Sequence, residues 1–213
     1  VGASFIICLA KNNGSYIDWQ TRRGWSLMFV HLHVHSSYSF LDSASTLESY
    51  LEQAARFEMP ALALTDHNNV SGAVDFQKKA LALGIKPIQG AEITTEDNTH
   101  LTLLAENQEG YRALCRLLTA GYASNTDRQC LVPWQALQDN AQGLIVLSGC
   151  HRSGLAQAVL RRDYNQAKQE ALRLVRIFGR GQVYLEMINS FLPITKHLLT
   201  WIFKLHQELK IPI

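Results

Sequence analysis

The sequence predicts an α/β fold in which a mostly parallel sheet is covered by helices. From Met28 onward, short apolar runs alternate with amphipathic stretches. Alternation of this kind is typical of barrels and of doubly wound sheets. The 213 residues are 47% hydrophobic and 18% charged. This ordinary composition excludes collagen-like, coiled-coil and wholly disordered chains.

The apolar runs predict six strands, and helical periodicity predicts helices between them. The predicted strands are 29–35, 61–65, 85–93, 101–105, 144–148 and 183–188. The predicted helices are 47–57, 72–83, 110–119, 133–139, 154–160, 166–178 and 195–209. The order of these elements favours one α/β domain.

Several residues mark the ends of these elements. Ser45 and Glu48 fit a capping box before the first helix. Gly84 stands where a helix should end, and Pro133 suits a first helical turn. Residues 210–213 resemble the entry to a further strand.

Residues 1–27 differ from the rest because they show no clear period. We expect an N-terminal extension over 1–27, with a strand at 4–9 as the alternative, and one domain over 28–213. No apolar run reaches the ~18 residues that span a bilayer. The four cysteines lack C-x-x-C spacing, which favours free thiols in a reducing compartment. We therefore expect a cytoplasmic protein that does not engage a membrane.

The charge balance is nearly even, with 20 Lys and Arg against 18 Asp and Glu and a net charge of +2. Proteins that bind polynucleotides mainly by neutralising phosphates are usually more basic. Charge alone therefore does not indicate a nucleic-acid partner.

The histidines are clustered, since five of the eight lie between His31 and His100. His31, His33 and His35 alternate along one predicted strand, so their imidazoles should share a face. A solvent-facing polar strip is the alternative. Asp42 follows shortly afterwards, on a loop that leaves this strand.

Further donor side chains occur at strand ends. His67 follows the apolar run 61–65, and Glu92 ends the run 85–93. His100 begins its strand, so it reaches the same edge only if that strand returns antiparallel. Cys150 or His151 follows the run 144–148. Each has a simpler reading as a turn, a helix cap or a surface charge.

Together these residues form a set of nitrogen, oxygen and sulfur donors at one edge of the predicted sheet. Such donors suit Zn²⁺, Mn²⁺ or Fe²⁺, and seven exceed the needs of one tetrahedral ion. We therefore expect two or three divalent metal ions. Clusters of this kind hydrolyse phosphoesters by generating hydroxide and clamping the reacting oxygens.

The motifs resemble the PHP (polymerase and histidinol phosphatase) superfamily. From about Met28 to the end, the sequence is similar to the N-terminal PHP domain of bacterial DNA polymerase III alpha subunits, replicative or error-prone. The segments that carry the resemblance are FVHLHVHSSYSFLDSAS, ALALTDHNNVSGAVDF, IKPIQGAEI, HLTLLAENQEGYRALCRL and GLIVLSGCHRSGLAQAV. Five motifs in order make the resemblance specific.

The resemblance implies a distorted (β/α)7 barrel with a trinuclear metal site. His33 and His35 would hold one ion, and Glu92 would bridge it to a second; these three residues are the expected catalytic residues. The complete implied ligand set is His33, His35, Asp42, His67, Glu92, His100 and Cys150. His31 is expected beside the ligands, and His151 could substitute for Cys150.

The resemblance also implies a function. The chain would be the PHP region of a DNA polymerase III alpha-type subunit with a phosphoesterase or 3′–5′ exonuclease site. Its partners would be DNA, through the parent polymerase, and the polymerase core and replisome subunits. The alternatives are a stand-alone phosphatase of the histidinol-phosphatase kind and a non-catalytic structural module. A last motif, an Asp and a His, would follow Ile213, so we expect a barrel that is incomplete at its C-terminus.

Overall fold

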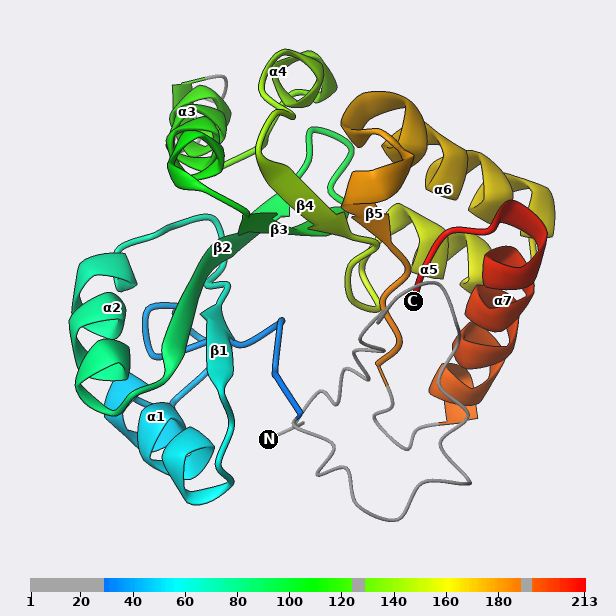
Figure 1. The fold of residues 1–213 in the computed structure, drawn as a ribbon. Helices are drawn as coiled ribbons and strands as arrows, with labels where there is room; N and C mark the ends of the chain where they lie inside the picture. Colours follow the sequence, from blue (N-terminus) through cyan, green and yellow to red (C-terminus); the bar gives the residue numbers. More distant parts are fainter. Residues whose placement is uncertain (1–28, 124–128, 189–192) are drawn as a thin grey trace.

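The computed structural model describes residues 29–123, 129–188 and 193–213, which form an α/β fold around one mixed sheet (Figure 1). Its strands are β1 (Ala61–Leu64), β2 (Lys86–Thr94), β3 (His100–Ala105), β4 (Leu144–Leu147) and β5 (Val183–Tyr184). Its helices are α1 (Leu47–Arg56), α2 (Ala73–Ala82), α3 (Gln108–Ala123), α4 (Trp134–Asp139), α5 (Gly154–Leu160), α6 (Tyr164–Phe178) and α7 (Pro193–Leu209), with a 3-10 turn at Arg180–Gln182. The expected extension over 1–27 and the alternative strand at 4–9 lie outside the described residues.

The five strands are hydrogen-bonded in the order β1-β2-β3-β4-β5. The β1–β2 and β4–β5 pairs are parallel, whereas β2–β3 and β3–β4 are antiparallel. The prediction of a mostly parallel sheet was therefore wrong, although the antiparallel return of His100 is confirmed. The cause is the short turn between β2 and β3, which reverses β3 and makes both of its ladders antiparallel.

The sheet is curved, and the helices lie on the outer side of the arc (Figure 1). The described residues contain an open sheet and no closed barrel. A chain segment extends each edge. The backbone NH groups of Ala63 and Thr65 donate to the carbonyls of His31 and Val34, and the NH of Leu185 donates to the carbonyl of Pro212.

The segment before β1 is not the regular strand predicted over 29–35. The side-chain oxygen of Thr65 accepts from the NH of Val34 at 2.8 Å and lies 3.1 Å from its carbonyl oxygen. A side chain thus takes the place of ladder hydrogen bonds, and the sequence pattern does not show such a substitution. The final residues 210–213 are also outside a regular strand.

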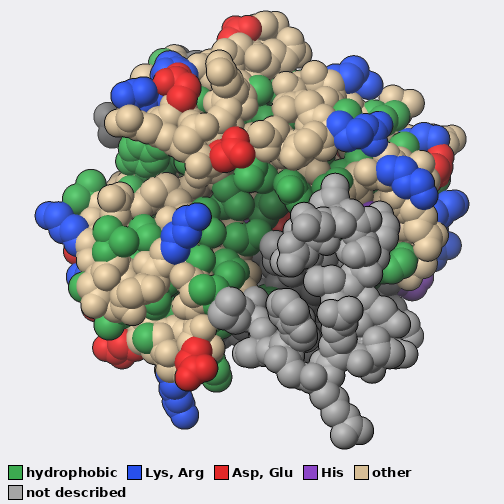
Figure 2. Space-filling view, in the orientation of Figure 1, with side chains coloured by type: hydrophobic (Ala, Val, Ile, Leu, Met, Phe, Trp, Pro, Cys, Tyr) green, Lys and Arg blue, Asp and Glu red, His purple; other side chains and the backbone are tan. Residues whose placement is uncertain are grey.

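The core is divided by the sheet. The largest buried cluster joins α3 to α7 with one face of β2, β3, β4 and β5, and a second joins α1 and α2 to β1. A third, small cluster of Ala63, Leu104 and Leu147 lies on the inner face. Hydrophobic side chains also gather near the centre of the view in Figure 2. Alternation along β3 separates Leu103, in the largest cluster, from Leu104, in the inner one.

Helix ends agree with the predictions within a few residues, with two local differences. The N-cap of α1 is Thr46, whose side chain accepts from the NH of Ser49, so the predicted capping box on Ser45 was wrong. Pro133 is the N-cap of α4 and does not lie in its first turn. Gly84 follows the C-cap of α2 with a φ of 71°, which is the expected glycine conformation there.

Two sequence predictions concern membrane-spanning segments and the state of the cysteines. None of the helices searched in the described part of the chain is long and apolar enough to cross a membrane. Cys115, Cys130 and Cys150 are free thiols, while Cys8 lies outside the described residues.

Candidate metal centre

His33 and His35 come from the segment beside β1 and face the same space. Their Nε2 atoms are 3.1 Å apart, and His33 is buried. Val34, between them, belongs to the cluster under α1 and α2. The segment therefore sends its two histidines and its valine to opposite sides, as expected of an extended chain. His31 packs edge-on against Phe29 instead, with ring centroids 4.6 Å apart.

The loop after His35 is fastened to the end of β1 by Asp66, which sequence reasoning did not select as a site residue. The carboxylate of Asp66 accepts from the NH and hydroxyl of Ser36 and from the hydroxyl of Ser39. Ser39 in turn accepts from the NH of His67. This network is buried. It fixes the loop that carries Asp42 against the loop that carries His67.

Asp42 then reaches two histidines. Its Oδ2 lies 2.5 Å from Nδ1 of His35 and 3.3 Å from Nε2 of His67. Half of the Asp42 side chain is exposed, so Asp42 lies at the open side of the cluster.

Glu92 lies at the centre of four imidazoles. Its Oε1 is 3.6 Å from Nε2 of His33 and 3.2 Å from Nδ1 of His100. Its Oε2 is 3.2 Å from Nε2 of His35 and 3.1 Å from Nδ1 of His67. The side chain is 1% exposed. Each carboxylate oxygen thus faces its own pair of histidines, which is the arrangement that a bridging carboxylate requires.

His100, the first residue of β3, and Cys150, which follows β4, complete the set. Cys150 Sγ lies 3.6 Å from Nδ1 of His100. Gly149 makes this approach possible: its φ is 86°, and a Cβ there would lie 2.5 Å from the carbonyl oxygen of His100. His151, the predicted substitute for Cys150, is exposed.

Six of the seven predicted ligands fall into three overlapping groups whose ligand atoms lie within 4.8 Å of one another. The groups are His33–His35–Glu92, His35–Asp42–His67 and His67–Glu92–His100. Each pair of groups shares one residue. Cys150 belongs to none of the three, although its thiol is next to His100.

The electrostatics of the cluster follow from burial and from Glu92. Burial would raise the pKa of Glu92, but the imidazoles of His100, His33 and His35 lower it far below its ordinary range. Burial would lower the pKa of His33, but Glu186 and Glu92 raise it to about 10. Burial prevails at His67 and lowers its pKa. Without metal the cluster therefore holds protons close to an ionised carboxylate.

The pKa values of Asp42 and Cys150, which flank the cluster, are also shifted by burial and by neighbouring charges. Burial would raise the pKa of Asp42, but His35 and His67 lower it. Burial, reinforced by Glu92, raises the pKa of the Cys150 thiol well above its ordinary range. A cation bound beside Cys150 would favour the thiolate instead.

The residues present fit divalent ions by a direct structural test. Oε1 of Glu92 and Oε2 of Glu186 are buried and have no hydrogen-bond partner among the described residues. A buried carboxylate oxygen without a hydrogen bond costs free energy unless a cation or proton compensates it. Glu92 also has imidazole nitrogens on both sides, and such nitrogen and carboxylate donors suit zinc, manganese or iron.

Sequence reasoning missed Glu186, which lies inside the predicted strand 183–188 and two residues after the end of the observed β5. Its Oε1 lies 2.6 Å from Nδ1 of His33, 153 residues away along the chain. The available signal was a single carboxylate near the end of an apolar run, but one Glu followed by Met187 and Ile188 is weak evidence.

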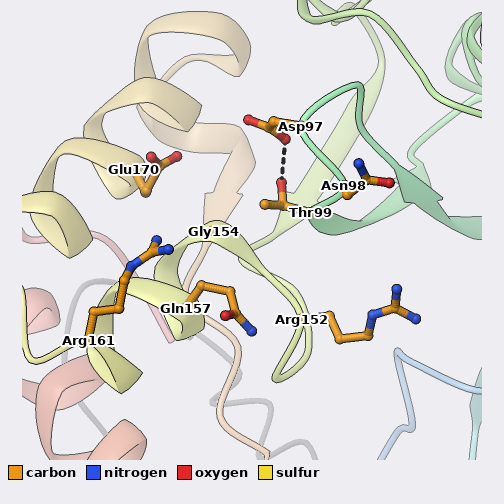
Figure 3. Close-up of a pocket in the computed structure, with 8 residues that line it drawn as sticks. All are labelled: Asp97, Asn98, Thr99, Arg152, Gly154, Gln157, Arg161 and Glu170. Atoms are coloured by element: carbon orange, nitrogen blue, oxygen red, sulfur yellow. Dashed lines mark hydrogen bonds between the residues drawn. The ribbon is translucent and has the colours of Figure 1, made fainter.

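A separate cavity of about 360 Å³ lies at the tip of the β2–β3 hairpin (Figure 3). It is lined by Asp97, Asn98, Thr99, Arg152, Gly154, Gln157, Arg161 and Glu170. The guanidinium groups of Arg152 and Arg161 lie well apart in this view, on either side of Gln157. This cavity contains none of the predicted ligands.

The PHP domain family matches residues 31–190 of this chain. The error-prone DNA polymerase of Symbiobacterium thermophilum is 46% identical over 183 residues, which cover 78% of this chain and 17% of that protein. The DNA polymerase III subunit alpha of Thermus aquaticus is 37% identical over 187 residues, or 80% of this chain and 15% of that protein. The error-prone DNA polymerase of Mycobacterium bovis is 36% identical over 198 residues, or 87% of this chain and 18% of that protein.

The chain therefore spans 15–18% of the length of these relatives. Among solved structures, an amidohydrolase from Chromobacterium violaceum aligns with a TM-score of 0.37 at 22% identity, over 69% of this chain and 49% of that one. A likeness at this level carries no argument about function.

Proposed function

The chain belongs to the PHP domain family, and from that premise we propose that it is the PHP region of a DNA polymerase III alpha-type subunit. Its cluster would be a multinuclear phosphoesterase site of the 3′–5′ exonuclease type. Two observations support this proposal: the polymerase relatives, and the position of Glu92 between four imidazoles. The second observation carries the assignment of chemistry.

The proposed ligands follow the three groups. His33 and His35 would share one ion with Glu92, and Glu92 and His100 would share a second with His67 or Cys150. Asp42 and His67 would serve a third, together with His35. The bound ions would lower the pKa of a water molecule and neutralise phosphate oxygens.

The chain's own residues would prepare the site for that chemistry. Glu92 keeps two pairs of imidazoles at fixed distances, so its two oxygens define where neighbouring cations sit. Asp66 and Ser39 hold the loop of Asp42 in place, and Asp42 lies at the exposed side from which a phosphoester would enter. Such preorganisation reduces the reorganisation that the reaction requires.

We also propose that the sheet is part of a distorted (β/α)7 barrel. The curvature with helices outside supports this (Figure 1). The hydrogen bond between His33, next to β1, and Glu186, after β5, supports it as well, because these elements stand at opposite ends of the strand order. The polymerase context, with DNA and replisome subunits as partners in the cytoplasm, belongs to the same proposal.

Metal analysis of the purified chain beside Glu92→Ala tests the proposal. We expect the wild-type chain to bind two or three equivalents of Zn²⁺ or Mn²⁺ and the variant to lose most of them. Equal metal content in both chains would contradict the proposed centre. Glu52→Gln, which changes an exposed charge on α1 outside the three groups of candidate ligands, is the matched control.

A nuclease assay separates the remaining functions. Release of nucleotides from the 3′ end of single-stranded DNA by the metal-loaded chain would support the exonuclease assignment. Hydrolysis of small phosphate monoesters alone would favour the stand-alone phosphatase. A chain that binds metal but hydrolyses neither would favour a structural module.

A further inference from the structure

Glu186 is a buried carboxylate outside the ligand set proposed above. It lies two residues after β5 and is 3% exposed. Its Oε1 is 2.6 Å from Nδ1 of His33, while its Oε2 has no hydrogen-bond partner among the described residues. A buried charge with one partner is costly, so its presence calls for a physical reason.

The backbone around Glu186 is held independently of His33. Its NH donates to the hydroxyl of Ser148 at 2.8 Å, and Ser148 follows β4. The NH of the preceding residue, Leu185, donates to the carbonyl of Pro212 at 2.8 Å. The end of the sheet therefore fixes the backbone from which the carboxylate of Glu186 reaches His33.

The contact determines which nitrogen of His33 carries a proton. A carboxylate without a proton only accepts hydrogen bonds, so the 2.6 Å contact with Oε1 of Glu186 favours the tautomer of His33 in which Nδ1 donates. In a neutral imidazole, Nε2 then has the free lone pair. That Nε2 lies 3.1 Å from Nε2 of His35 and 3.6 Å from Oε1 of Glu92. The lone pair thus faces the candidate metal group.

We propose that Glu186 is a positioning residue of the metal centre, which orients His33 and holds its proton on Nδ1 so that Nε2 can bind a cation. This inference rests on the proposed function. Carboxylates that fix a ligating histidine in this way raise metal affinity by about 10–100-fold. Glu186 acts through His33 and does not itself bind the ion.

Thr102 provides a matched control because it approaches the same nitrogen. Its Oγ1 lies 3.2 Å from Nδ1 of His33, and the residue is buried on β3 opposite Glu92. A hydroxyl can donate or accept, so Thr102 does not dictate the position of the proton. Thr102→Val keeps the shape of the side chain and should leave metal affinity within about threefold of wild type.

The test is a titration with Zn²⁺, against a competing chelator, of wild type, Glu186→Gln, Glu186→Ala and Thr102→Val. We expect the two Glu186 variants to bind the same number of ions as wild type, with at least one ion bound about 10–100-fold more weakly. Glutamine is the sharper variant because its amide can donate as well as accept. Melting of the metal-free chains reports whether each variant folds.

Three outcomes would overturn the inference. Unchanged affinity in Glu186→Gln, with lower metal-free stability, would make the contact merely structural. Loss of one ion would make Glu186 a ligand. Nitrogen NMR of the metal-free wild type and Glu186→Ala, at a pH where the imidazole of His33 is neutral, provides an independent readout, because the same proton position on Nδ1 in both chains would show that Glu186 does not hold it there. A wild-type chain that binds no Zn²⁺ or Mn²⁺ would contradict the proposed function itself.

Discussion

Glu92 and Asp97 are carboxylates on the same β2–β3 hairpin, and they have opposite surroundings. Glu92 faces four imidazoles, and one of its oxygens has no hydrogen-bond partner among the described residues. Asp97, at the tip, accepts from the hydroxyls of Thr95 and Thr99 and from the indole NH of Trp134. Its charge is also 3.4 Å from Arg173.

The difference separates a ligand site from a structural contact. Protein donors satisfy Asp97, which needs no further ligand, whereas each imidazole donates to Glu92 only when the ring nitrogen that faces it carries a proton. Arg173 also stacks over Trp134 with 3.4 Å to the ring centroid, so the tip is anchored to α4 and α6. The cavity of Figure 3 lies beside Asp97 and contains none of the predicted ligands, so the chemistry of the donors is what identifies the candidate site.

The largest expected effect is at Glu92. Glu92→Gln keeps the shape but removes the charge that both pairs of imidazoles share. We expect Zn²⁺ affinity to fall by more than about 100-fold, since removing a ligand should cost more than removing its support. Calorimetric titration measures this fall. Asp97→Asn in the same assay should leave affinity and stoichiometry unchanged, and a comparable loss there would remove the distinction between the two carboxylates.

Cys150 offers an intermediate test, because its thiol is near His100 but outside the three groups. We expect Cys150→Ser to weaken the binding of one ion by about tenfold, and to weaken Zn²⁺ more than Mn²⁺ because thiolates favour softer ions. Parallel titrations with the two metals check this. Cys115→Ser, a free cysteine on α3, should have no effect on either. Equal behaviour of the two serine variants would remove Cys150 from the centre.

The smallest expected effect is on stability at the tip. Burial would raise the pKa of Asp97, but the hydroxyls of Thr95 and Thr99 and the indole NH of Trp134 lower it, with help from Arg173. The folded-state pKa lies below the unfolded value of about 4, so Asp97 stabilises the fold above that pH and loses this contribution as the pH falls further.

We expect Asp97→Asn to lower the free energy of unfolding by about 1 kcal/mol at neutral pH. The loss is modest because 44% of the side chain is exposed. The difference in the free energy of unfolding between Asp97→Asn and wild type should shrink near pH 3. Urea unfolding of both chains at neutral pH and near pH 3 measures this difference. Glu52→Gln should differ from wild type by less than about 0.5 kcal/mol. A difference for Asp97→Asn that grows in acid would contradict the anchoring role.

The position of each candidate ligand relative to its strand explains which ligands could be predicted from the sequence. His33 and His35 were predicted from alternation along one run, and His67 and Glu92 were predicted because each lies near the carboxyl end of an apolar run. His100 required the further inference of a reversed strand, and the β2–β3 ladder confirms it. Glu186 follows the same rule, but β5 has two residues in regular pairing, so its end was hard to locate.

The sequence by itself determined the order and type of most of the elements, the family, and the donor set that meets at one edge of the sheet. Periodicity and strand ends are local properties, so they can be read along the chain. The tertiary structure decided the mixed direction of the sheet, the irregular segment at His33, the anchoring role of Asp66 and the contact of Glu186 with His33. These features depend on hydrogen bonds between residues far apart in the sequence, as with the 153 residues between His33 and Glu186, and only folding brings such groups within bonding distance.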